Sequence, residues 1–164
     1  MATKDLLLQE LAAEAGKTRA ALQRVPADKA EFKPHAKSMS LGRLAAHLAQ
    51  LGGFAHPILT QPQLDFATAG MKPLPFNSVP QLLESYDAGV AAVRSDLGKL
   101  DEPAWTDPWK LCMGEQVFFS GSRFLAYRAM YANHIVHHRA QLGVYLRLLS
   151  VPVPSTYGPS ADEQ

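Results

Sequence analysis

Apolar residues recur at helical spacing in four separate segments of this chain, and prolines separate the segments. The clearest segment follows Ser78, and its apolar residues are three or four positions apart: Val79, Leu82, Tyr86, Val90, Val93, Leu97 and Leu100. Pro80 falls in its first turn, and Gln81 follows Ser78 by three positions, which is typical of a capping box. This spacing predicts an amphipathic α-helix.

The other three segments run from about Lys4 to Arg24, from Ser40 past Ile58, and from about Ser122 to Ser150. Between the third and fourth helical segments, a short apolar run on each side of Met113-Gly114-Glu115 allows a small hairpin within 109–119. The sequence therefore predicts an all-α protein, a four-helix bundle with long loops and at most a small hairpin before the last helix. In such bundles, ligand sites are commonly built from facing helices.

Length and charge narrow the class of protein further. The 164 residues suggest one domain, with 152–164 as a Pro- and Gly-rich surface tail. The formal charge is +1 and the basic residues are scattered, which disfavours a nucleic-acid partner. No apolar run approaches the roughly 20 residues of a membrane span. The N-terminus lacks the apolar stretch of a signal peptide, and the single cysteine, Cys112, fits a reducing compartment. We therefore expect a cytoplasmic protein with no membrane partner.

Histidines are the residues most suggestive of chemistry. His134 and His138 are four positions apart, so they project from one face of the last helix. At about 100° per residue, the apolar face of that helix is centred near this pair, and its arginines lie on the far side. His47 shares an apolar stripe of the second helix with Leu44 and Leu51. The remaining histidines lie off these stripes or in a loop: His35, His56 and His137.

Three inward imidazoles from two helices favour a divalent metal site, because neutral imidazole suits zinc, nickel, copper or iron(II). Three protein ligands leave one coordination position open, as in catalytic rather than structural zinc sites. The alternative is that each ring is hydrogen-bonded within the core. The stretch from His134 to His138 lacks the glutamate of H-E-x-x-H, which disfavours a metalloprotease.

Several other residues have two interpretations. Cys112 is either an inert thiol or a nucleophile, and nothing nearby in the sequence favours the second. The tyrosines of the last helix are either core aromatics or partners of a metal-bound group, and Arg139 and Gln141 are either solvated or supports for a ligand. We expect the segment 105–119 to line a cleft leading to His134, with Trp109, Cys112 or Phe118 in its wall. The alternative is that these side chains only fill the core.

The segments around these histidines resemble the DinB-like family of metal-dependent bundle proteins. The similarity lies in Met39–Leu48 (MSLGRLAAHL), in Asn133–Leu142 (NHIVHHRAQL) and in the closing residues 151–160. The order of a second-helix histidine followed by His-x-x-x-His-Arg-x-Gln-Leu spans most of the chain. Ala140 stands where the family often has glycine, a difference that does not affect a ligand.

This resemblance implies an up-down-down-up bundle, a long crossover between the second and third helices, and a homodimer. It also implies that His47, His134 and His138 hold zinc, nickel or a similar ion, with water completing its coordination. In the family such a metal is thought to activate a small thiol, so we expect a metal-dependent enzyme, a thiol-dependent transferase, whose general base the sequence does not identify. The alternatives are a metal-dependent hydrolase, a non-catalytic stress-related dimer that binds a metal or ligand, and a purely structural bundle.

Overall fold

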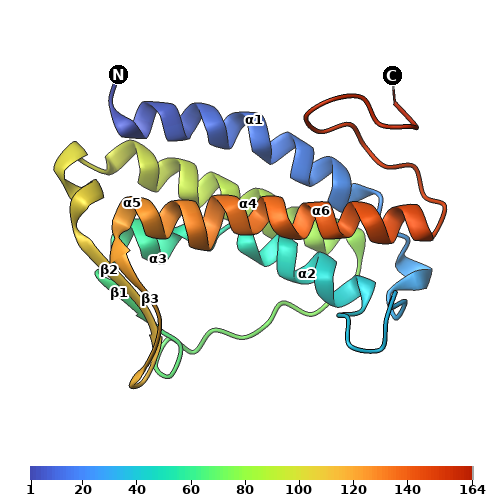
Figure 1. Ribbon diagram of the computed structural model, residues 1–164, viewed down its shortest axis with the longest axis horizontal. Helices are drawn as coiled ribbons and strands as arrows, with labels where there is room; N and C mark the ends of the chain where they lie inside the picture. The colour runs from blue at the N-terminus through green and yellow to red at the C-terminus, as the bar shows by residue number, and fades with distance from the viewer. Residues whose placement is uncertain (164) are drawn as a thin grey trace.

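The computed structural model describes residues 1–163, and its longest elements are four helices of 11 to 21 residues. They are α1 (Thr3–Gln23), α2 (Leu41–Leu51), α4 (Val79–Lys99) and α6 (Asn133–Leu148). Figure 1 shows α1 and α6 running in one direction and α2 and α4 in the other. The shorter helical elements are η1 (Ala27–Lys29), α3 (Ala55–Thr60), η2 (Glu102–Thr106), α5 (Arg123–Ala126) and the π-helical η3 (Tyr127–Ala132).

Serine side chains cap several of these helices, because a hydroxyl oxygen can accept from an otherwise unpaired amide of the first turn. Ser40 accepts from the amide of Arg43 at 3.4 Å at the start of α2. Ser78 accepts from the amide of Gln81 at 3.3 Å at the start of α4. The cap predicted at Ser78 is therefore present, although the Gln81 side chain bonds to the amide of the preceding Asn77.

The helices pack α1 against α4, and α2 against both α4 and α6. The α2–α3 connection approaches α4 so closely that no side chain fits between them. A Cβ added to Gly89 of α4 would lie 2.5 Å from the backbone nitrogen of Gly53. This contact holds the end of α2 against α4.

We expect Gly89→Ala to lower the free energy of unfolding by about 1–3 kcal/mol, because the methyl group would meet backbone atoms that cannot move aside. Gly98→Ala on the same helix is the matched control, since nothing lies within 4 Å of its added Cβ. That change should stabilise the protein by about 0.5–1 kcal/mol through helix propensity. Urea denaturation of both variants measures the two effects. Equal values would contradict the close contact.

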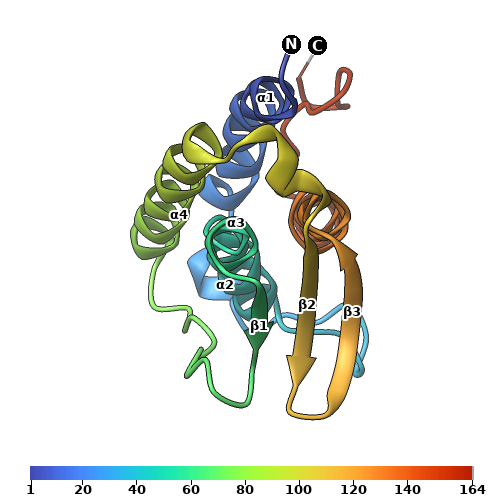
Figure 2. The same cartoon turned by 90° about the vertical axis from the view of Figure 1, so that its left-hand side faces the viewer.

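The prediction of an all-α protein is wrong, because a three-stranded mixed sheet packs at one end of the helices (Figure 2). Its strands are β1 (Gln63–Asp65), β2 (Pro108–Met113) and β3 (Gln116–Ser122). β2 and β3 form an antiparallel hairpin, within the segment where the sequence allowed one, and β1 pairs with β2 in parallel. A three-residue strand carries no periodic pattern of its own, so β1 forms only because β2 supplies its hydrogen-bonding partner.

The hairpin turn and the first strand are joined by one side chain. Gly114 occupies the turn with φ 59°, a conformation that glycine adopts without a Cβ penalty. The carboxylate of Asp65, at the end of β1, accepts hydrogen bonds from the amides of Gly114 at 3.0 Å and Ala67 at 2.9 Å. These bonds lower the pKa of Asp65. The sheet is thus fixed to the start of the segment that crosses to α4.

The last helical segment is not uniformly α-helical, because η3 inserts a π turn between α5 and α6. A π turn adds a residue to the helical repeat and rotates the faces on either side of it relative to each other. After α6 the chain turns back, and the residues up to 163 lie along α1 and α6 (Figure 1). Within residues 1–163, no helix is both long and apolar enough to cross a membrane.

Candidate metal centre

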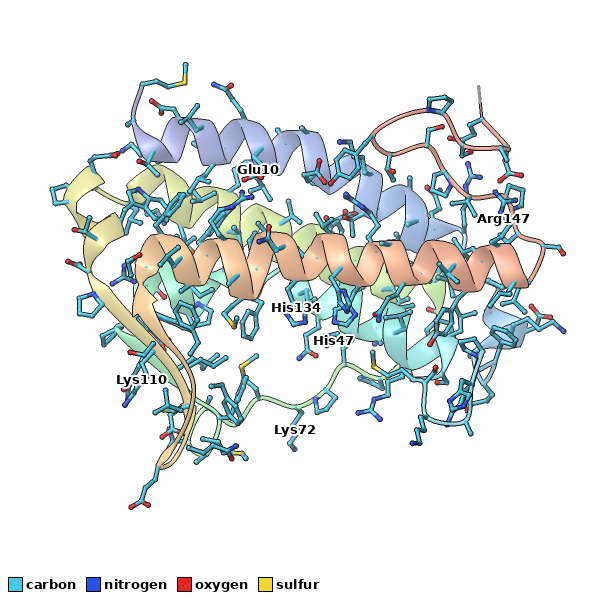
Figure 3. All side chains as sticks on the ribbon, in the orientation of Figure 1. Glu10, His47, Lys72, Lys110, His134 and Arg147 are labelled. Atoms are coloured by element: carbon cyan, nitrogen blue, oxygen red, sulfur yellow. The ribbon has the colours of Figure 1, made fainter. Side chains whose placement is uncertain are left out.

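Three histidines converge where α2 faces α6. His47 comes from α2, and His134 and His138 come from successive turns of α6. One ring nitrogen from each residue lies within 4.8 Å of the others. His138 is buried and the other two are partly buried. Figure 3 shows His47 and His134 approaching each other from the two helices.

Neighbouring groups hold the rings of the α6 pair. The Nδ1 atom of His138 lies 2.7 Å from Oε1 of Gln141, and Nδ1 of His134 lies 3.3 Å from the carbonyl oxygen of Met130. An acceptor at Nδ1 places the imidazole proton there and leaves Nε2 as a lone pair. The two Nε2 atoms are only 2.9 Å apart. Two lone pairs at this distance repel each other unless a cation lies between them, so the donor set fits a metal ion.

A reversed Gln141 amide gives the competing arrangement. Its NH₂ group would donate to Nδ1 of His138, which would then donate from Nε2 to His134. This metal-free chain of hydrogen bonds is the structural alternative raised by the sequence. The two arrangements differ in the charge they require at the centre of the cluster.

Burial favours the neutral form of all three rings. Burial, followed by the charges of His138, His134 and Arg43, lowers the pKa of His47 to about 4. Burial likewise lowers the pKa of His134 and of His138. Neutral imidazole is the form that binds a metal. The cluster is therefore ready to ligate a cation at neutral pH.

The remaining histidines lie outside the cluster. His137 is exposed, and its ring centroid lies 4.8 Å from that of His138. His56 pairs with Asp96 at 2.7 Å near the surface, and His35 accepts from the amide of Lys37. The structure thus brings together the three histidines that the sequence singled out. Their role as ligands stays a prediction.

The tyrosines of the last helical segment are core aromatics. The Tyr131 hydroxyl donates to the carbonyl of Gly52 at 3.4 Å, and that of Tyr145 donates to Met39 at 3.0 Å. Tyr127 is fully buried beside Trp105. Of the two residues that could support a ligand, Gln141 contacts a histidine of the cluster, whereas Arg139 does not.

Arg139 is buried, although the helical geometry predicted an arginine-bearing outer face for its helix. Its guanidinium donates to Thr18 at 3.1 Å and to Glu14 at 2.6 Å on α1, and to the hydroxyl of Tyr157 at 2.6 Å in the tail. The α1 helix and the tail cover this side of α6. The angular spacing of residues around one helix does not show which of its faces other elements cover.

A cavity of about 430 Å³ opens beside His47 and His134. The rest of its wall comes mainly from α2 and from the crossover to α4: Met39, Arg43, Gln50, Leu51, Phe54, Phe66, Met71, Lys72, Pro73, Leu74, Leu111 and Met130. The prediction that residues 105–119 line this cleft is wrong except at Leu111. Trp109 and Cys112 are buried in the core, and the Trp109 indole donates to Pro57.

Gln50 positions the crossover and was missed in the sequence. Its side-chain nitrogen donates to the carbonyl of Lys72 at 2.8 Å, and its side-chain oxygen accepts from the amide of Leu74 at 3.2 Å. Because Gln50 follows His47 by one helical turn, the same spacing argument that joined the histidines places it at the site. These two hydrogen bonds hold residues 72–74 in the wall of the cavity.

The protein is a helical bundle with a small sheet at one end and a histidine cluster between α2 and α6. This combination defines a class of bundle proteins whose donor set is compatible with metal binding. The chain belongs to the DinB family, whose family model matches residues 1–164, and the resemblance noted in the sequence is confirmed. Comparison with curated proteins finds no match.

Two solved structures show the same fold. A DinB-like protein from Bacillus cereus aligns with a TM-score of 0.68 at 20% identity, over 92% of this chain and 95% of that one. A DinB-like protein from Bacillus subtilis aligns with a TM-score of 0.67 at 14% identity, over 97% of this chain and 99% of that one. At these identities, the likeness extends to the fold alone.

Proposed function

We propose that the protein is a metal-dependent enzyme in which His47, His134 and His138 hold one divalent ion beside the cavity. The observation that carries this proposal is the 2.9 Å distance between the Nε2 atoms of His134 and His138, with Nδ1 of His134 facing the Met130 carbonyl and Nδ1 of His138 facing the Gln141 amide. Three imidazoles suit zinc or nickel, which are the ions we propose. When bound, such an ion lowers the pKa of a thiol or water ligand.

We propose a thiol-dependent transferase rather than a hydrolase. None of the described residues that line the cavity is a carboxylate, so the wall offers no Asp or Glu as a general base for water. A thiol ionises more readily than water and needs no such base. The apolar wall residues, among them Phe54, Leu111 and Met130, exclude water from the reacting groups.

We further propose that the protein is a homodimer, as the resemblance implies. Light scattering tests this oligomeric state.

A thiol conjugation assay tests the proposed activity. Glutathione, cysteine and other small thiols are offered separately with chlorodinitrobenzene, so that a C–S bond forms, chloride leaves and the thiol proton passes to buffer. We expect zinc- or nickel-loaded protein to accelerate conjugation and the His47→Ala variant to fall to the uncatalysed rate. Metal-loaded protein with no acceleration for any thiol would favour the non-catalytic binder.

We expect Gln141→Leu to weaken metal affinity by about 10–100-fold, because His138 loses the acceptor that fixes its ring and its proton. Gln141→Glu is the matched control. Its carboxylate can only accept, so affinity should be kept or improved. Competition with a chromogenic chelator measures both variants. If Gln141→Glu bound metal as weakly as Gln141→Leu, the proposed proton arrangement would be wrong.

A further inference from the structure

The arginines of this protein differ in whether they have a carboxylate partner, and this difference is relevant to the cavity. Six of them lie within 4.0 Å of a carboxylate: Arg19, Arg24, Arg123, Arg128, Arg139 and Arg147. Among residues 1–163, Arg43 and Arg94 have no such partner. Both side chains are exposed, but Arg43 on α2 also belongs to the wall of the cavity beside the histidines, whereas Arg94 lies on α4.

Arg43 precedes His47 by four positions on α2, so the two side chains share a helix face. The other cationic wall residue, Lys72, extends away from the bundle in Figure 3. With no carboxylate among the described wall residues, Arg43 gives this side of the cavity an uncompensated positive charge. A guanidinium presents several donors in a plane, which suits a carboxylate or a similar oxyanion.

Most of the remaining wall is apolar. It includes Met39, Leu51, Phe54, Phe66, Leu111 and Met130. Gln50, the one amide side chain among the described wall residues, already bonds to the crossover. A volume of about 430 Å³ is within the range of small-molecule sites. The cavity thus combines a largely apolar interior with the cationic side chain of Arg43.

We propose that Arg43 binds the anionic group of the substrate, and that this substrate is a small apolar carboxylate whose hydrocarbon part fills the cavity beside the histidines. This inference rests on the proposed function, since it takes the same cavity as the substrate site. Arg43 sets which molecules enter and how they are oriented. Because His47 lies one turn of α2 from Arg43, the histidine cluster then faces the hydrocarbon part of the substrate rather than its anionic group.

Calorimetric titration with octanoate and octanol tests the proposal, because the two probes share an apolar chain and differ in charge. We expect the full-length protein to bind octanoate about tenfold more tightly than octanol, the gain typical of a charge-assisted hydrogen bond. Arg43→Gln should lose this preference. Arg94→Gln, the matched unpaired arginine, should keep it. Equal binding of the two probes to wild type, no binding of either, or a preference that survives Arg43→Gln would overturn the proposal.

The His138→Ala variant separates this result from the metal proposal. Arg43 is not part of the histidine cluster, so the octanoate preference is expected to persist in this variant even where metal is lost. Persistence would support the role of Arg43 whether or not the protein is a metal enzyme. Loss of the preference in His138→Ala would show that the cluster, rather than Arg43, holds the carboxylate, and would overturn the inference.

Discussion

His138→Ala is expected to remove bound metal while leaving an assembled helical protein. Wild-type protein purified without a histidine tag should contain close to one divalent ion per chain, and the variant almost none. The fold should survive, because the core consists of many other buried side chains, such as Leu44, Leu82, Leu97 and Leu142. Metal analysis by mass spectrometry and far-ultraviolet circular dichroism measure the two properties.

His137→Ala is the matched control for this experiment. His137 is the adjacent residue on α6, but its exposed side chain lies outside the cluster, so metal content should be unchanged. Adding metal should raise the melting temperature of wild type and of this control, but not of His138→Ala. At a free metal concentration about 100 times Kd, the expected stabilisation is about 3 kcal/mol. Full metal content in His138→Ala would exclude the proposed ligand set, and complete unfolding would show a structural ion.

Arg139→Met is expected to lower the free energy of unfolding by about 3 kcal/mol, because it leaves the buried partners of a charged group unsatisfied. The Arg139 side chain is only 4% exposed. Without its guanidinium, the buried Thr18 hydroxyl loses the hydrogen bond from Arg139, and the partly buried Glu14 carboxylate keeps only Lys17 and Tyr157 as side-chain donors. Arg147→Met on the same helix is the control, because the side chain of Arg147 is 48% exposed in its pair with Asp162. That change should cost no more than about 1 kcal/mol. Similar losses in the two variants would contradict the buried network.

Arg139→Met should also alter how the free energy of unfolding depends on pH. Although partial burial would raise it, hydrogen bonds from Lys17, Arg139 and Tyr157 lower the pKa of Glu14 from 4.5 to about 2. A carboxyl group with a lowered folded-state pKa stabilises the protein above its ordinary pKa, and that contribution is lost as pH falls toward the folded value. In Arg139→Met the Glu14 pKa should move back toward 4.5. The loss of stability between about pH 5 and pH 2 should then become shallower in urea denaturation.

Local pattern accounts for the part of the site that the sequence identified. The His134 and His138 pair follows from helical spacing, and His47 follows from its place on an apolar stripe, because a helix buries its apolar face whatever its neighbours are. The cap at Ser78 was likewise predictable, since the hydrogen bond it makes spans only three residues. Every one of these features depends on residues close in the chain.

What the sequence left undetermined depends on contacts between distant residues. The three residues of β1 become a strand only through β2, so the helical spacing in the sequence predicted an all-α class. Besides α2, the crossover rather than the hairpin supplies most of the cavity wall, because Gln50 holds Lys72 and Leu74 there.

The sequence by itself determined four helical segments, the apolar stripe of each and the three histidines on those stripes, because these are set by the 3.6-residue period of a single helix. Tertiary structure alone decided that Arg139 is buried, that Arg43 has no carboxylate partner among residues 1–163, and that a cavity adjoins His47. These properties depend on which groups from other elements arrive within a few ångströms of a side chain. The spacing of apolar residues within one segment carries no information about these contacts with other elements.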